Sequence, residues 1–194
     1  MMADPWSVPA ARGAALAWRR WRYLLDKQLP MLDLGCGDGA QTAFLAEHLP
    51  RVLGIDARPD AGALAGEAPV RHLDLLDPVA VRALHDELGD ANVYCRALLS
   101  SAPPETQPRL IDAMESLLGA RGVMYLEEPT PAAAAATDPP LPSGIDRDRV
   151  AALFSGERFR LFGEGRAALG LADGGEAEGY WVMLRSGREG DDFK

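Results

Sequence analysis

The chain has 194 residues, of which 47% are apolar and 25% are charged, and its formal net charge is −9. This length fits one ordinary domain, and the composition is that of a globular protein rather than a disordered or fibrous one. A chain this acidic would repel phosphate groups, so we expect no nucleic-acid partner. It contains no run of 18 apolar residues, so we expect no membrane-spanning helix and no membrane partner.

The two cysteines, Cys36 and Cys95, lie far apart in the sequence and have no metal-ligand spacing, so no metal site is expected. Two unpaired cysteines suit a reducing compartment. The first residues also lack the charged start and apolar stretch of a secretory signal. We therefore expect a cytoplasmic protein.

Apolar periodicity, prolines and glycines predict the following elements. In chain order, these are a helix over 14–28, a strand over 31–34, a helix over 40–49, a strand over 51–56, a short helix over 60–66, a strand over 70–75, a helix over 77–88, a strand over 92–98, a helix over 107–118, a strand over 123–127, a helix over 146–154, and strands over 159–169 and 180–185. Strands that alternate with helices predict a parallel sheet. The last two strands have no helix between them and should pair antiparallel at its edge.

Three segments follow from this pattern. Residues 1–29 should form a helical segment that packs on the core, residues 30–186 a single domain, and residues 187–194 a disordered tail. The proline-rich residues 129–144 predict a long mobile loop above the carboxyl ends of the strands, in which the alanine run alone could form a helical turn.

The strongest motif is Asp-Leu-Gly-Cys-Gly-Asp-Gly over residues 33–39, at the end of the first strand. Glycines at a strand-to-helix turn let a ligand approach the backbone closely. The spacing also satisfies a dinucleotide fingerprint, and Asp56 stands where a ribose-binding acid belongs. However, Asp33 precedes the glycines, and its negative charge would repel a pyrophosphate but attract a ligand with a cationic head.

The sequence resembles the class I S-adenosylmethionine-dependent methyltransferases. The resemblance rests on MLDLGCGDG (31–39), VLGIDAR (52–58), RHLDLLDP (71–78), ANVYCRALLSSAP (91–103) and GARGVMYLEEP (119–129). It implies an α/β fold, a Rossmann-like doubly wound sheet of seven strands in the order 3-2-1-4-5-7-6 with strand 7 antiparallel. It also implies S-adenosyl-L-methionine as the cofactor.

The resemblance assigns cofactor contacts to the first three strand ends. Asp33 would lie near the amino group of the cofactor, the glycines against its methionine part, and Asp56 would accept both ribose hydroxyls. Asp74 would accept from the adenine amino group, although a helix-capping role is the alternative, one that Asp77 fills better. The full expected set comprises Asp33, Gly35, Cys36, Gly37, Asp56, Ala57, Asp74, Leu75 and Arg96.

The fourth and fifth strand ends supply the catalytic candidates Arg96, Ser100 and Glu127. Arg96 in an apolar strand needs an anionic partner, which is Asp33 or Asp74 in one reading and a bound ligand in the other. Ser100 stands where similar proteins often have histidine, so the sequence shows no histidine base here.

Two further questions concern the orientation of a glutamate pair and the roles of two tryptophans. Glu127 and Glu128 are consecutive in a strand, so one should face the cleft and the other face away, although a solvated pair is the alternative. Trp21 reads as a core residue, and Trp6 as a lid over the cofactor.

These features predict transfer of a methyl group to an O, N or C nucleophile of a small molecule by a monomer or homodimer. A protein that binds the cofactor without methylating is the second hypothesis. A nicotinamide-dependent oxidoreductase is the third.

Overall fold

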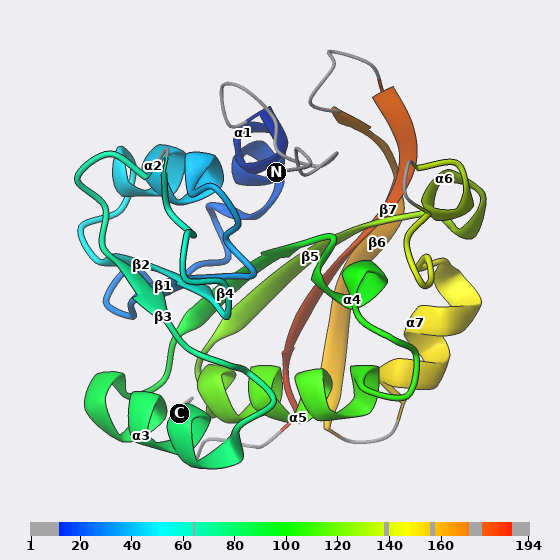
Figure 1. Ribbon diagram of the computed structural model, residues 1–194. Coiled ribbons are helices and arrows are strands. Elements are labelled where there is room, and N and C mark those ends of the chain that lie inside the picture. Colours follow the sequence, from blue (N-terminus) through cyan, green and yellow to red (C-terminus); the bar gives the residue numbers. More distant parts are fainter. Residues whose placement is uncertain (1–11, 64, 138–139, 156–157, 171–175, 188–194) are drawn as a thin grey trace.

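The computed structural model describes residues 12–63, 65–137, 140–155, 158–170 and 176–187. A seven-stranded sheet in the order β3-β2-β1-β4-β5-β7-β6 forms its centre (Figure 1). The strands are β1 (Met31–Leu34), β2 (Val52–Asp56), β3 (Val70–His72), β4 (Asn92–Arg96), β5 (Val123–Pro129), β6 (Phe159–Gly170) and β7 (Glu176–Ser186). The first five strands are parallel, and β7 pairs antiparallel with both β5 and β6. The predicted fold and strand order are confirmed.

Helices cover both faces of this sheet. They are α1 (Arg12–Trp21), α2 (Ala40–Ala46), α3 (Pro78–Leu88), α4 (Leu98–Ser101), α5 (Gln107–Leu118), α6 (Pro131–Ala135) and α7 (Arg147–Leu153). Figure 1 shows α1 and α2 on one face, with α3 and α5 on the opposite face. None of the helices in the described part of the chain is long and apolar enough to cross a membrane.

Alternation along the central strands divides the core into two clusters. Tyr94 and Tyr125 pack with Trp21 of α1 on one face, while Cys95 and Leu126 join the core under α3 and α5. Because side chains alternate along a strand, Arg96 lies on the Tyr94 face. Arg96 therefore lies at the carboxyl end of β4, on the face of the sheet that α1 covers.

The first helix is shorter than its apolar periodicity predicts. It ends at Trp21, and the amide of Leu24 donates to the Trp21 carbonyl in a turn. Asp26, in the segment leading to β1, accepts a hydrogen bond from the amide of Gln28 and pairs with Arg121. The predicted range of 14–28 is therefore wrong at its end, because the chain turns back toward the sheet once Trp21 is buried.

Several other element boundaries differ from those predicted: α2 ends at Ala46 rather than at 49, β3 ends at His72 rather than at 75, and β7 begins at Glu176 rather than at 180. The described residues of the 60–66 segment form turns rather than a helix, with Gly62 and Gly66 at φ of 84° and 63°. The fourth strand ends at Arg96 rather than at residue 98, because Ala97 takes a φ of 53° and starts α4. The sequence showed no separate helix there.

The 129–144 segment is not one continuous loop, because its alanine run forms the short helix α6, the alternative that the sequence allowed. Pro129 closes β5, and Pro131 occupies the first turn of α6, where its missing N–H costs no hydrogen bond. Thr130 caps this helix by accepting from the amide of Ala133. Whether the segment moves when ligands bind stays a prediction. Trp6 and the tail over 188–194 lie outside the described residues.

Candidate functional site

A glycine loop joins β1 to α2. Gly35, Gly37 and Gly39 have φ of 70°, 58° and 86°, a backbone region that side chains disfavour. Leu98 packs against one end of the loop, where a Cβ on Gly35 would meet its Cδ1 at 3.0 Å. A Cβ on Gly39 would meet Ala65 at 2.7 Å. Conformation and packing therefore both require glycine here.

Asp56, the last residue of β2, anchors this loop. Its Oδ2 accepts from the Gly37 amide at 2.9 Å, and its Oδ1 accepts from the Arg58 amide at 2.8 Å. Arg58 Nε also donates to Oδ1, at 3.2 Å. Three of the about four lone-pair sites of the carboxylate are therefore used, and the site that stays open to a ligand is on Oδ2. The sequence did not reveal this anchoring contact, because it depends on the parallel register of β1 and β2.

Asp33 is buried on the same edge of the sheet, at 2% exposure. Thr42 of α2 donates to its Oδ2 at 2.6 Å. Burial raises the pKa of Asp33, the Thr42 hydrogen bond lowers it and the neighbouring Asp56 charge raises it, which together bring the pKa to about 7. A cation that arrives beside Asp33 would therefore stabilise its ionised form.

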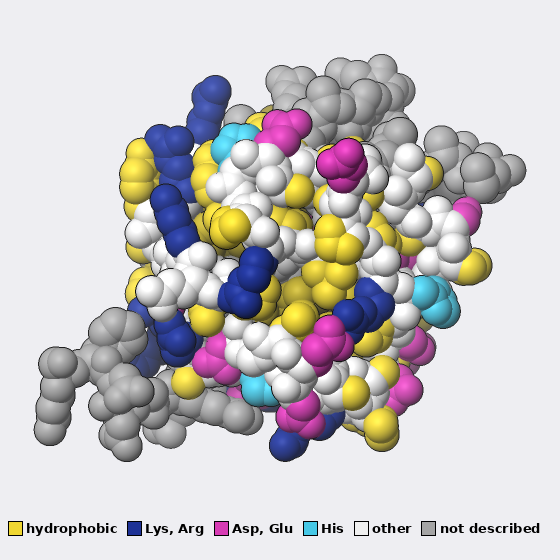
Figure 2. All heavy atoms as spheres, turned by 90° about the vertical axis from the view of Figure 1, so that its left-hand side faces the viewer, with side chains coloured by type: hydrophobic (Ala, Val, Ile, Leu, Met, Phe, Trp, Pro, Cys, Tyr) yellow, Lys and Arg dark blue, Asp and Glu magenta, His cyan; other side chains and the backbone are white. Residues whose placement is uncertain are grey.

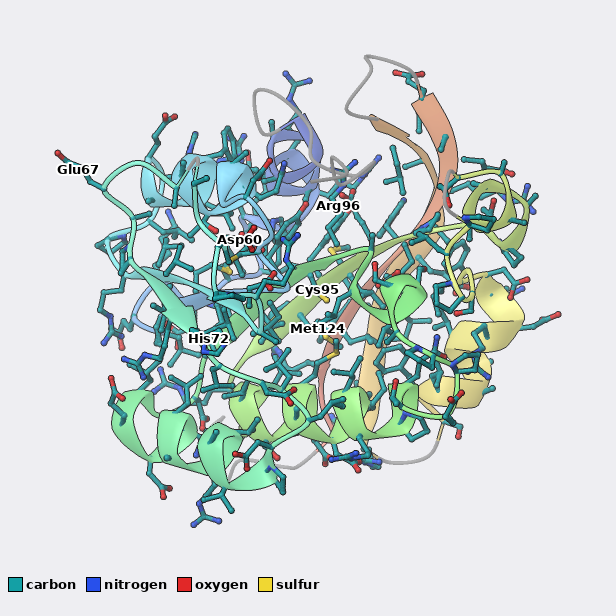
Figure 3. The ribbon with its side chains drawn as sticks, viewed as in Figure 1. Asp60, Glu67, His72, Cys95, Arg96 and Met124 are labelled. Carbon is teal, nitrogen blue, oxygen red and sulfur yellow. The ribbon has the colours of Figure 1, made fainter. Side chains whose placement is uncertain are left out.

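Arg96 and Glu127 meet at the ends of β4 and β5, where they are register partners. Arg96 Nε lies 4.0 Å from Glu127 Oε2, and both side chains are almost fully buried. Figure 3 shows Arg96 at the end of β4 nearest α1, with Cys95 beside it on the strand. Among the described residues, the ion pair of Arg96 is thus with Glu127 rather than with Asp33 or Asp74, but its charge still lowers the pKa of Asp33.

A third element reaches the same glutamate. Arg20 of α1 lies 3.7 Å from Glu127 Oε1, donates to the Tyr125 hydroxyl at 2.9 Å and stacks over Trp181. The Tyr125 hydroxyl donates to Glu127 Oε1 at 3.3 Å. Burial raises the pKa of Glu127, and the charges of Arg96 and Arg20 oppose this rise. We call Arg20, Arg96, Tyr125 and Glu127 the α1–β5 cluster.

No protein-family model matches this chain, and no curated protein matches it. Its structure is similar to that of an S-adenosylmethionine-dependent methyltransferase from Anabaena variabilis, with 25% identity, a TM-score of 0.82 and coverage of 94% of this chain and 88% of that chain. The fold of this chain is that of the S-adenosylmethionine-dependent methyltransferases.

Two more methyltransferases of this fold were solved with S-adenosylhomocysteine bound. The N-methyltransferase NodS from Bradyrhizobium japonicum is 18% identical, with a TM-score of 0.65 and coverage of 93% of this chain and 89% of that chain. The magnesium protoporphyrin IX methyltransferase from Synechocystis is also 18% identical, with a TM-score of 0.63 and coverage of 91% and 83%. At such identities, these likenesses concern the methyltransferase fold alone.

Within this methyltransferase fold, Cys36 and Ala57 differ in their surroundings. Cys36 is 5% exposed, and burial raises its pKa to about 12, so the thiol stays protonated and packs inside the loop. Ala57 is exposed directly after Asp56.

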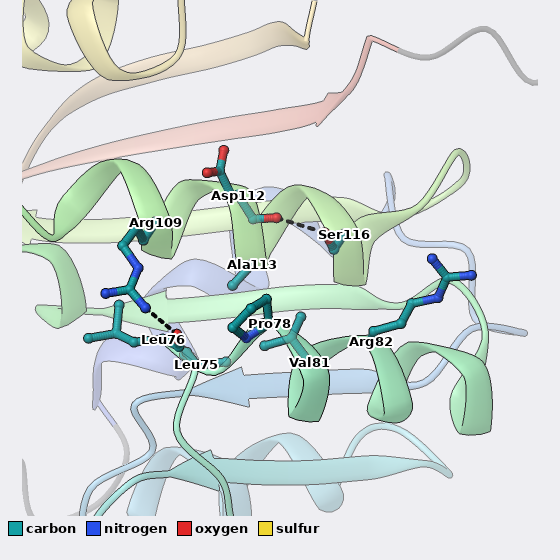
Figure 4. Close-up of a pocket in the computed structure, with 9 residues that line it drawn as sticks. All are labelled: Leu75, Leu76, Pro78, Val81, Arg82, Arg109, Asp112, Ala113 and Ser116. Atoms are coloured by element: carbon teal, nitrogen blue, oxygen red, sulfur yellow. Dashed lines mark hydrogen bonds between the residues drawn. The ribbon is translucent and has the colours of Figure 1, made fainter.

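Asp74 and Leu75 follow β3. Asp74 is exposed and accepts from the Leu76 amide at 2.8 Å, while Asp77 caps α3 as predicted. Leu75 is buried and lines a hollow of about 280 Å³ between α3 and α5, where Arg109 donates to the Leu76 carbonyl (Figure 4).

On the face of the molecule seen in Figure 2, acidic and basic side chains surround a centre of apolar ones.

The two consecutive glutamates lie on opposite sides of β5, as alternation predicts, but both are buried, so the solvated pair is wrong. Glu128 accepts from the amides of Leu99 and Ser100, each at 2.9 Å, and from the Ser100 hydroxyl at 2.5 Å. Ser100 is fully buried, and its hydroxyl is already used. This geometry argues against Ser100 as a catalytic residue.

Proposed function

We propose that this chain is an S-adenosylmethionine-dependent methyltransferase that acts on an O, N or C nucleophile of a small molecule. The observation that carries the proposal is the glycine loop, held open at positive φ and fixed by the Gly37–Asp56 hydrogen bond. The fold and the buried Asp33 beside this loop support it. Membership of the class I family is part of the same proposal.

The residues present fit the cofactor. Asp33 would take its ammonium group, Asp56 its ribose hydroxyls, and the loop backbone its methionine part. Asp74, which is exposed shortly after β3, would accept from the adenine amino group. When bound, the cofactor supplies an electrophilic methyl group, so the protein needs mainly to align the nucleophile with it.

The α1–β5 cluster supports a role in orientation rather than in proton transfer. Glu127 is 1% exposed and already faces two arginines and the hydroxyls of Tyr94 and Tyr125, so it fixes the direction of Arg96. Arg96 would then present its charge to an anionic group of the cofactor or of the acceptor. A strong general base is not required for this chemistry.

Ligand-dependent thermal unfolding tests the proposal. S-adenosylhomocysteine at about 100 times its dissociation constant should stabilise the protein by about 2.7 kcal/mol, which raises Tm by roughly 5–10 °C for a chain of this size. NAD should leave Tm unchanged. Stabilisation by NAD alone would favour an oxidoreductase, and stabilisation by S-adenosylhomocysteine without transfer to any acceptor would favour a non-methylating protein.

Cofactor affinity should rise with pH. The folded-state pKa of Asp33 is about 7, and a bound ammonium group favours the ionised carboxylate, so binding releases a proton below that pH. We expect the dissociation constant for S-adenosylhomocysteine to fall up to about tenfold per pH unit below 7 and to level off above 7. Calorimetry in two buffers of different ionisation enthalpy measures this proton release. An Asp33→Asn variant with the parent's pH profile would assign the titration to another group.

Asp56→Ala should weaken S-adenosylhomocysteine binding by about 2–3 kcal/mol, because charge-assisted hydrogen bonds and the anchor of the loop are lost together. Asp60→Ala removes the same charge from an exposed position nearby and serves as the control. Equal dissociation constants for the two variants by calorimetry would remove Asp56 from the site.

A further inference from the structure

Glu128 is a buried carboxylate that none of the proposed cofactor contacts uses. It is fully buried at the end of β5, and the hydrogen-bond donors that it meets among the described residues belong to α4. The amide of Leu99 donates to Oε1, while the amide and the hydroxyl of Ser100 donate to Oε2. Both carboxylate oxygens therefore hold this one short helix.

Helix α4 needs such support because of how it begins. Ala97, which joins β4 to α4, has a φ of 53° and is the only residue other than glycine with positive φ in the described part of the chain. Its amide donates to the Glu127 carbonyl at 2.8 Å. A side chain disfavours this conformation, so neighbouring contacts must maintain it.

The other end of α4 is also fixed. Gln107 Nε2 donates to the Leu99 carbonyl at 2.8 Å, and the Ser143 amide donates to the Ser100 carbonyl. Four residues cannot form a stable helix alone, so these contacts and Glu128 determine where α4 lies.

The first residue of α4 reaches the glycine loop. The Leu98 side chain lies so close to Gly35 that a Cβ there would meet its Cδ1 at 3.0 Å. The amides bound by Glu128 follow Leu98 directly in the chain. The position of the Glu128 carboxylate therefore determines, through one turn of α4, where the Leu98 side chain packs against the glycine loop.

We propose that Glu128 is a positioning residue for the cofactor, which holds α4 so that Leu98 supports the glycine loop at Gly35. The inference rests on the proposed function, because it concerns the same cofactor. Under this inference, Glu128 of β5 contributes to cofactor binding without touching the cofactor, which the loop after β1 would contact.

The experiment measures S-adenosylhomocysteine binding by calorimetry well below the Tm of every variant, so that each protein is folded. Glu128→Gln places an NH₂ group against amide donors and should weaken binding about tenfold, since one donor is left unsatisfied. Glu115→Gln is the control, because it neutralises a largely buried glutamate on α5 that pairs with Arg158. This variant should lose stability but keep the parent's dissociation constant.

Rescue separates positioning from general stability. Adding Ala97→Gly to Glu128→Gln removes the backbone strain at φ 53° and should recover at least about a third of the lost affinity on a logarithmic scale. Leu98→Ala removes the contact with Gly35 without burying an unpaired group, and should weaken binding severalfold even if Glu128→Gln does not fold.

Three results would overturn the inference. They are a parent-like dissociation constant for Glu128→Gln, a parent-like one for Leu98→Ala, or no gain from Ala97→Gly. If the parent protein itself fails to bind S-adenosylhomocysteine, the proposed function fails and the inference fails with it. A parent that binds, together with a Glu128→Gln variant that binds equally well, overturns the positioning role alone.

Discussion

Gly37→Val is expected to abolish detectable binding of S-adenosylhomocysteine. Gly37 has a φ of 58°, where a side chain costs about 1–2 kcal/mol, and a β-branched residue is further restricted at χ1. Its amide must also point at Asp56 for the loop to keep its shape. Together with the bulk placed where the ligand approaches, these effects should weaken binding by on the order of 100-fold or more, which equals about 2.8 kcal/mol.

The control for this variant is Gly89→Val. Gly89 ends α3 at a φ of 73° with open space around it, so valine there suffers backbone strain away from the glycine loop. Both variants should lose Tm, but only Gly37→Val should lose binding. If Gly37→Val folds and binds S-adenosylhomocysteine like the parent, the glycine loop is merely a tight turn.

The sheet could be predicted from the sequence because its signals are local. Each parallel strand is a short apolar run, and helical periodicity or a glycine or proline separates it from the next. Boundaries failed where tertiary contacts override these signals. The helix ending at Trp21 kept an apolar pattern beyond its end, and the strand ending at Arg96 was followed by Ala97, whose positive φ no sequence rule favours.

The candidate site likewise contains residues that the sequence predicted and residues that only the structure brings together. The glycine loop, Asp33 and Asp56 lie in or beside recognisable motifs, so their proximity follows from parallel strand order. The α1–β5 cluster joins Arg20 to Tyr125 across 105 positions of the chain, and it depends on the register of β4 and β5 and on how α1 packs. The contact of Glu128 with α4 also could not be predicted, because the sequence does not indicate which groups a glutamate at a strand end will meet.

Arg96→Met is the second variant with a large expected effect. Methionine keeps the apolar stem but removes the charge that faces the buried Glu127. Arg20 still lies 3.7 Å from that carboxylate, so the loss should be near the lower end for a broken buried pair, about 2–3 kcal/mol of unfolding free energy at pH 8. Arg82→Met, which breaks an exposed pair with Asp86, should cost less than about 0.5 kcal/mol.

The pH dependence of this loss identifies the partner. Burial already raises the pKa of Glu127, and removing Arg96 should raise it further, because an opposing charge is lost. A carboxyl whose pKa is higher in the folded than in the unfolded state binds its proton more tightly when folded, so stability falls as pH rises between the two values. The deficit of Arg96→Met relative to the parent should therefore grow with pH above the unfolded pKa, and adding Glu127→Gln should reduce it. Denaturant unfolding between pH 5 and 8 measures both effects. A deficit independent of pH, with cofactor affinity lost instead, would mean that Arg96 holds the bound ligand and that Glu127 is not its essential partner.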